Sequence, residues 1–159
     1  VLLTSRQQVA AIVEQQRAVA SNAVQLVDEL PAGSHAELRA ALPGVSLIQV
    51  IHVGGPEALD EARAVAPAVD AILLDSGNPA LAVKELGGTG RVHDWGISRQ
   101  IVAALETPVF LAGGLDAGNV GQAIAQVRPF GVDLCNGVRT AGELDGAKLS
   151  AFMAAVAAA

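Results

Sequence analysis

The chain of 159 residues has no tyrosine, a single cysteine and only 3% aromatic residues. Platforms that stack nucleic-acid bases depend on aromatic rings, so their scarcity argues against that function. One cysteine, Cys135, excludes an internal disulfide and is typical of a reducing compartment, so we expect a cytoplasmic protein. Basic residues are also few. With 10 Lys and Arg against 16 Asp and Glu, the net charge is −6, which disfavours nucleic acid and anionic membranes as partners.

Long apolar runs are absent as well. No stretch approaches the ~20 residues that a membrane-spanning helix needs, and no charged-then-apolar leader opens the sequence. No linker or low-complexity segment divides the chain, so residues 1–159 are expected to form a single domain. His35, His52 and His93 are not spaced as metal ligands, and we expect neither a metal nor a cofactor.

The sequence instead shows a strict alternation of strand and helix patterns. The expected strands are Val1–Thr4, Ala23–Val27, Ser46–Val53, Ala71–Leu74, Pro108–Ala112 and Gly131–Cys135. A helix pattern follows each strand. Two of these helices are expected to start with capping boxes, at Ser5 with Gln8 and at Ser34 with Glu37. Three others are expected to start at Pro56, Asp94 and Asp116, and the last, Ala-rich helix starts at about Ala147. Such alternation predicts a parallel sheet with right-handed crossovers.

Two architectures fit this pattern. Six units form an open, flavodoxin-like sheet, or they form six of the eight units of a (β/α)8 barrel, which normally needs ~200 residues or more. Periodicity alone does not choose between them. The missing initial Met and the start inside a strand favour an incomplete barrel. We expect its unpaired edges to be filled by further residues, covered by a partner chain or left open.

The stretch from the fourth strand to the fourth helix concentrates the chemistry. The apolar strand Ala71–Leu74 runs directly into Asp75, and a long loop containing Gly88 and Gly90 leads to Asp94. This is how α/β enzymes present an acid beside an anion pocket, and the glycines allow the loop to close over a ligand. From the residues alone, a helix cap or an ion pair explains Asp75 equally well.

Two glycine-containing turns follow the later strands. Gly113 and Gly114 follow the fifth strand, and Asn136 and Gly137 follow the sixth. Backbone amides at such positions commonly hold phosphate in barrels, and simple turn chemistry is the alternative. Asp133 lies between apolar neighbours and needs a partner, either a substrate hydroxyl or a backbone amide.

Three other polar side chains are open to two interpretations. Arg139 either neutralises a phosphate or carboxylate or is a solvated surface side chain. Cys135 is expected to be a buried small side chain rather than a nucleophile. His52 ends a strand and so reaches the rim, where a structural role is the simpler interpretation.

Several motifs stand in order along the chain: VQL, LLDS, ELGGTGRVHDW, VFLAGGL, RPFGVD and GVR. Together they resemble phosphoribosylanthranilate isomerase, a tryptophan-pathway enzyme, over nearly the whole chain. The resemblance implies a (β/α)8 barrel of which this chain supplies strands three to eight. The strand bearing the family's catalytic-base cysteine would then lie outside it, and we expect the isolated chain to be inactive.

The resemblance also implies roles for individual residues. The reaction is an Amadori rearrangement of N-(5-phosphoribosyl)anthranilate, and Asp75 maps onto its general acid. Asp133 maps onto an Asp that faces the substrate. The substrate phosphate is held by backbone amides, here those of Gly113, Gly114, Asn136 and Gly137. An anionic phosphosugar is therefore the expected ligand, and a homodimer is a further expected partner.

The chain departs from the family pattern at the rim of the barrel. Val27 and Asp28 replace His-Gly, residues 135–139 replace Ser-Ser-Gly-Val-Glu, and His93 replaces Phe. These departures leave the exact substrate open. They motivate an alternative hypothesis, a phosphate-ligand-binding barrel that is non-catalytic or differently specific.

Overall fold

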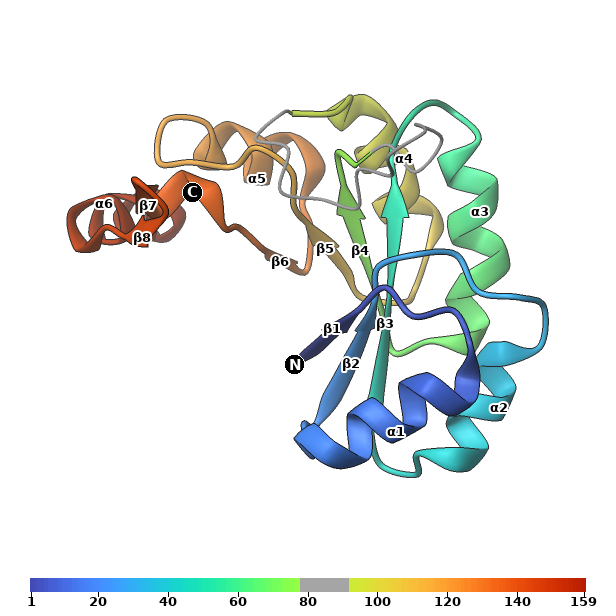
Figure 1. The fold of residues 1–159 in the computed structure, drawn as a ribbon. Coiled ribbons are helices and arrows are strands. Elements are labelled where there is room, and N and C mark those ends of the chain that lie inside the picture. Colours follow the sequence, from blue (N-terminus) through green and yellow to red (C-terminus); the bar gives the residue numbers. More distant parts are fainter. Residues whose placement is uncertain (78–91) are drawn as a thin grey trace.

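The computed structural model describes residues 1–77 and 92–159. Six parallel strands form one sheet, and each is followed by a helix (Figure 1). The strands are β1 (Leu2–Thr4), β2 (Ala23–Leu26), β3 (Ser46–His52), β4 (Ala71–Asp75), β5 (Val109–Leu111) and β6 (Gly131–Val132). The helices are α1 (Val9–Val19), α2 (Ser34–Ala41), α3 (Ala58–Val65), α4 (Trp95–Ala104), α5 (Val120–Val127) and α6 (Gly146–Ala157). Within the described ranges, no helix has the length and apolar character needed to cross a membrane.

The strand order decides between the two expected architectures. Each strand pairs in parallel with the next one along the chain, giving the order β1-β2-β3-β4-β5-β6. A flavodoxin-like sheet reverses its winding direction at a switch point, and none occurs among these strands. The open-sheet alternative is therefore wrong, and the winding is that of a (β/α)8 barrel.

The sheet has two different faces. Its outer face packs against the helices, and strand residues such as Leu47, Ile51 and Leu74 belong to this large core. On the inner face, Val50, Leu73 and Ala112 form a smaller cluster. Because successive side chains of a strand point to opposite sides, this division also assigns the strand ends to a face.

The predicted start of α4 is confirmed. Asp94 is the N-cap residue, and its side chain accepts a hydrogen bond of 2.7 Å from the N–H of Gly96. The N-cap carboxylate satisfies one of the free N–H groups at the start of the helix. It fixes the position at which α4 begins.

The two predicted capping boxes are wrong. The helix expected from Ser5 begins at Val9, and its N-cap residue Gln8 makes no side-chain bond. The helix expected to be capped by Ser34 instead begins at Ser34, after Gly33. Gly33 has a φ of 86°, a left-handed conformation that glycine adopts without steric cost, so the backbone turn replaces the side-chain cap.

The C-terminal part holds a feature that the sequence analysis did not predict. Strand β6 ends at Val132, and a 3-10 turn over Asn136–Val138 leads into an antiparallel hairpin of β7 (Arg139–Thr140) and β8 (Glu143–Leu144). Asp145 then caps α6 by accepting hydrogen bonds from the N–H groups of Ala147 and Lys148. Phe152 anchors this helix in the outer core and is 2% exposed.

The anchoring of α6 gives a stability prediction. We expect Phe152→Ala to lower the free energy of unfolding by about 3–5 kcal/mol, because it leaves a cavity in the outer core. Met153, on the same helix, is 57% exposed, and Met153→Ala is the matched control with an expected change under about 0.5 kcal/mol. Urea denaturation followed by circular dichroism measures both variants. Similar losses in the two would contradict the assigned packing.

Candidate active site

Four neighbouring strands place one residue each in a single row at their carboxyl ends. His52 of β3 is the register partner of Asp75 of β4. The pairing of Leu74 with Leu111, and of Leu111 with Val132, extends the row to Ala112 and Asp133. Backbone hydrogen bonds from the N–H of Ala112 to Leu74 and from that of Asp133 to Leu111 continue this register. All four residues lie on the inner face.

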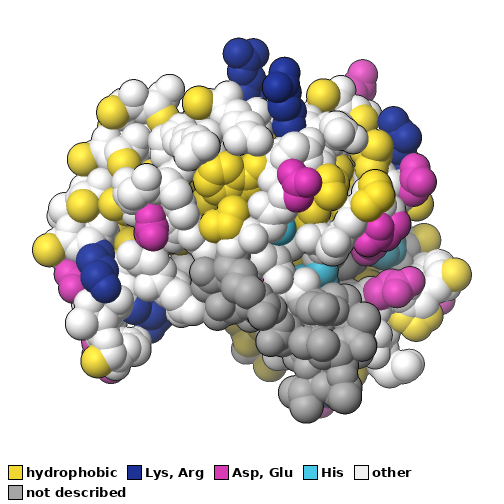
Figure 2. All heavy atoms as spheres, turned by 90° about the horizontal axis from the view of Figure 1, so that it is seen from above, with side chains coloured by type: hydrophobic (Ala, Val, Ile, Leu, Met, Phe, Trp, Pro, Cys, Tyr) yellow, Lys and Arg dark blue, Asp and Glu magenta, His cyan; other side chains and the backbone are white. Residues whose placement is uncertain are grey.

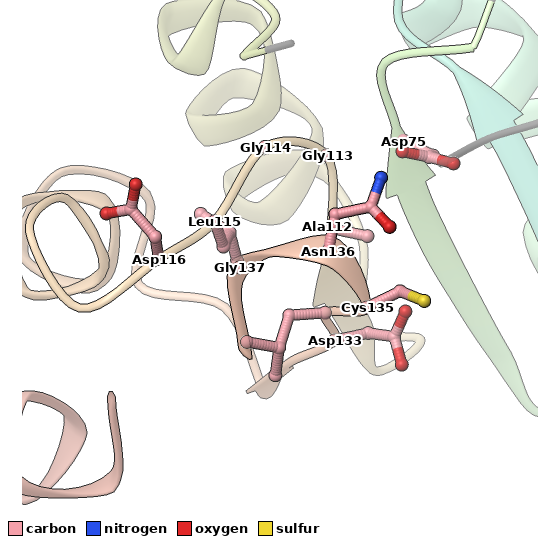
Figure 3. A pocket seen from close by; sticks show the side chains of 11 residues that line it. Asp75, Ala112, Gly113, Gly114, Leu115, Asp116, Asp133, Cys135, Asn136 and Gly137 are labelled. Atoms are coloured by element: carbon pink, nitrogen blue, oxygen red, sulfur yellow. The ribbon is translucent and has the colours of Figure 1, made fainter. Parts of the chain in front are cut away.

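A pocket of about 260 Å³ lies above the middle of this row. It is lined by Asp75, residues 112–116 and residues 133–137. Ala112 has the smallest side chain of the row and leaves the floor of the pocket open, with Asp75 on one side and Asp133 on the other (Figure 3). The volume lies just below the ~300–1,000 Å³ of pockets for drug-sized ligands, so it suits a small polar molecule.

The loop after β5 forms one wall of the pocket. Gly113 and Gly114 have φ values of 85° and 65°, which other residues adopt only with strain. A Cβ at Gly113 would also lie 2.9 Å from Oγ of Ser76. The N–H groups of both glycines make no hydrogen bond within the described chain. Free successive amides of this kind can bind an anion.

The turn after β6 is held against that loop by a second glycine. A Cβ at Gly137 would overlap the carbonyl oxygen of Leu115, so only glycine allows the two backbones to approach this closely. Asn136, beside it, directs its side chain toward Asp75 (Figure 3). Six predicted residues therefore line one pocket: Asp75, Gly113, Gly114, Asp133, Asn136 and Gly137.

The pocket is acidic on one side and rich in amides on the other. No Lys or Arg is among its lining residues. Asp75 is 9% exposed, and one of its oxygens accepts a hydrogen bond of 2.7 Å from the N–H of Ser76. Burial raises the pKa of Asp133, and the charge of Asp75 raises it further. The charge of Asp75 thus acts on Asp133 across the pocket and favours the protonated form of Asp133.

Arg139 is not brought to the pocket. It belongs to the hairpin strand β7, is exposed, and its guanidinium donates a hydrogen bond of 2.6 Å to the carbonyl of Gly142. This placement favours the surface interpretation over contact with a phosphate. Gly88 and Gly90, the predicted loop glycines, lie outside the described residues.

Cys135 differs from the expectation. It was expected to be buried, but its side chain is exposed and lines the pocket (Figure 3). The reason is that β6 ends at Val132, so Cys135 lies beyond the strand, on the rim.

Two histidines also surround Asp75, and neither was predicted as a site residue. His52 precedes it in the row, and His93, just before α4, interacts electrostatically with it. Burial lowers the pKa of His93, so this ring is neutral at physiological pH. Recessed histidines beside acidic side chains appear on the face toward which the strands point (Figure 2). The register between strands would have shown the place of His52, but no motif contains it.

The sheet and the pocket define a class of protein: a (β/α)8-type barrel with a carboxylate and a loop of free backbone amides at the carboxyl ends of its strands. The family model of N-(5'-phosphoribosyl)anthranilate (PRA) isomerase matches residues 2–155. The chain belongs to this family.

Several relatives are similar to this chain. It is 41% identical over 127 residues to N-(5'-phosphoribosyl)anthranilate isomerase of Methanocella arvoryzae, covering 80% of this chain and 57% of the relative. It is 42% identical over 142 residues to that of Haloferax volcanii, covering 87% and 59%. The structure of phosphoribosyl anthranilate isomerase from Thermotoga maritima matches with a TM-score of 0.79 and 26% identity, over 99% of this chain and 72% of that one. The chain thus spans less than two thirds of the length of these curated relatives.

The close approach at Gly137 can be tested by substitution. We expect Gly137→Ala to destabilise the protein by about 1–3 kcal/mol, because the added methyl group displaces the loop after β5. Gly121, inside α5, has open space around it, so Gly121→Ala should stabilise by about 0.5–1 kcal/mol. Thermal or urea unfolding measures both. A neutral Gly137→Ala would show that the two loops do not touch as described.

The interaction of the two carboxyl groups predicts a pH effect. The pKa of Asp133 is raised, so the folded protein binds its proton more tightly than the unfolded chain and loses stability as pH rises through the raised value. We expect Asp75→Asn to lower the pKa of Asp133 only in part, because burial is the larger cause. Carbon-13 NMR of the carboxyl groups follows this titration. An unchanged pKa of Asp133 in Asp75→Asn would exclude the interaction.

Proposed function

We propose that this chain provides the general acid and the phosphate site of an N-(5'-phosphoribosyl)anthranilate isomerase. The observation that carries the proposal is that Asp75 and the amide loop at Gly113 and Gly114 line one pocket, at the end of the barrel where such enzymes react. Relatives about 42% identical carry this name. The substrate would be an anionic phosphosugar joined to an aromatic amine.

The reaction needs an acid and a base at different points of the sugar. Protonation of the furanose ring oxygen opens the ring to a Schiff base, and removal of the C2 proton then gives an enaminol. The enaminol becomes the aminoketose when C1 takes up a proton and the 2-hydroxyl group loses one. Asp75 would deliver the first proton, and its 9% exposure at the end of a buried strand supports this role. The amides of Gly113 and Gly114 would hold the phosphate. Asp133, on the opposite side of Ala112, would accept a hydrogen bond from a sugar hydroxyl.

The base is not assigned to a residue of this chain. The family resemblance places it on a strand outside the 159 residues. Turnover is therefore proposed for a protein in which this chain is combined with the βα units that its longer relatives carry. A homodimer remains a prediction.

A second candidate is a barrel that binds a phosphate ligand without this chemistry. The departures at Val27 and Asp28 favour it, as does the position of Arg139, which turns to the hairpin rather than to the pocket. Such a protein would retain the amide site and would not isomerise the substrate.

Ligand binding and turnover test the proposal separately. The probe is reduced 1-(o-carboxyphenylamino)-1-deoxyribulose 5-phosphate, with which one structurally similar phosphoribosyl anthranilate isomerase has been crystallised. We expect it to shift the backbone NMR signals of Gly113 and Gly114 in this chain, and inorganic phosphate to compete with it. We expect Asp75→Asn to bind the probe within about threefold of wild type, because the phosphate site is intact.

Turnover is measured on the chain combined with the N-terminal units of a relative. We expect Asp75→Asn to lower kcat by at least about 100-fold, the usual contribution of a general acid. Binding of the probe without turnover in the unsubstituted protein would favour the second candidate. Absence of binding would overturn both.

A further inference from the structure

We infer that Asn119 is a positioning residue of the phosphate site, because its side-chain amide holds the loop after β5 with N–H groups rather than a carbonyl oxygen toward the pocket. The inference rests on the proposed function, which assigns the phosphate to this loop. It gives a role to a side chain that is not itself among the lining residues of the pocket.

The side chain of Asn119 binds both peptide units that flank Leu115. Its Nδ2 donates a hydrogen bond of 2.9 Å to the carbonyl oxygen of Gly114. Its Oδ1 accepts a hydrogen bond of 3.0 Å from the N–H of Asp116. A carbonyl oxygen can only accept and an N–H can only donate, so these partners also fix which end of the side-chain amide is which. One planar amide therefore sets the orientation of two successive peptide planes.

These two contacts decide which way the loop presents its polar groups. In a planar trans peptide unit, the C=O and the N–H that follows it point in opposite directions. The N–H of Asp116 points to Asn119, and the carbonyl of Leu115 accordingly lies on the other side, against Gly137 of the pocket wall. By the same geometry, the carbonyl of Gly114 points to Asn119 and the N–H of Leu115 points away from it. That N–H makes no hydrogen bond to the residues that the structure describes, like those of the two glycines before it.

The loop needs such a contact because two successive glycines hold it weakly. Gly113 and Gly114 both have positive φ, and glycine adopts positive and negative φ about equally readily. A flip of the peptide unit between Gly114 and Leu115 would turn the carbonyl oxygen of Gly114 to the side of the free N–H groups. An anion is attracted by N–H groups and repelled by a carbonyl oxygen. The flipped loop would therefore bind phosphate less tightly, and the bond from Asn119 opposes the flip.

A role in capping α5 explains only half of these contacts. Oδ1 of Asp116 accepts hydrogen bonds from the N–H groups of Gly118 and Asn119, at 2.7 and 3.1 Å, and its carboxylate turns away from Asp75 (Figure 3). With the bond that Oδ1 of Asn119 accepts in return, this is a reciprocal capping box before the helix. The box needs only an acceptor at position 119. The bond from Nδ2 to Gly114 lies outside the box and joins the start of the helix to the loop.

The substitution Asn119→Asp separates the two roles. Its carboxylate still accepts from the N–H of Asp116, but it cannot donate to Gly114 and repels the carbonyl oxygen there. We expect the dissociation constant of inorganic phosphate, titrated against the full chain by nitrogen-15 NMR, to rise about two- to tenfold, the size of one hydrogen bond. Tm should fall by less than about 3 °C, because the capping box is kept. Gln122→Glu is the matched control, since it adds the same charge at an exposed position of α5, and it should stay within about twofold of wild type.

Several results would overturn the inference. One is equal phosphate binding by Asn119→Asp and Gln122→Glu, and another is the absence of phosphate binding by the unsubstituted protein. A fall in Tm of more than about 10 °C in Asn119→Asp would assign the side chain to stability alone. A last measurement needs no variant: an NMR scalar coupling across the hydrogen bond from Nδ2 of Asn119 to the carbonyl carbon of Gly114, whose absence would exclude the contact.

The reduced phosphate probe of the proposed function is titrated in the same samples. If it binds the unsubstituted protein and Asn119→Asp equally well, the positioning role fails while the proposed function stands. If phosphate binding weakens in Asn119→Asp but the reduced probe does not bind the unsubstituted protein, the positioning role stands while the proposed function fails. The two failures are therefore distinguishable.

Discussion

The parallel register of β3 to β6 is the constraint on which the site depends. It brings His52, Asp75, Ala112 and Asp133 to the same height on one face, although they are up to 81 positions apart in the chain. A shift of one residue in any strand would turn its member of the row into the outer core. The outer core prevents this, because side chains such as Leu47 and Leu74 are fully buried against the helices.

Much of the fold followed from local patterns. The apolar run at Ala71–Leu74, the cap at Asp94 and the regular alternation of elements each depend on residues close in sequence, and each was predicted correctly. The capping boxes at Ser5 and Ser34 failed because the helices begin elsewhere than the pattern suggests: Ser5 lies four residues before the start of α1, and Ser34 is already the first residue of α2. The hairpin after Asn136–Val138 was missed since its strands have only two residues each.

The identity of the pocket residues was easier to predict from the sequence than their positions relative to one another. Asp75 and the glycines after β5 and β6 stood out because strand ends and glycine pairs are visible in sequence, and family resemblance gave them roles. Other features depend on where β6 ends and on which strands are neighbours. They are the exposure of Cys135, the distance of Arg139 from the pocket and the position of His52 at the end of β3. These are long-range facts, and no window of sequence contains them.

The small size of Ala112 has a consequence of its own. Its side chain is 4% exposed and forms the bottom of the pocket between the two carboxyl groups. A larger side chain there would raise this floor while leaving every hydrogen bond of the rim in place. The depth of the pocket can therefore change by a single substitution, independently of the carboxyl groups and amides that line it.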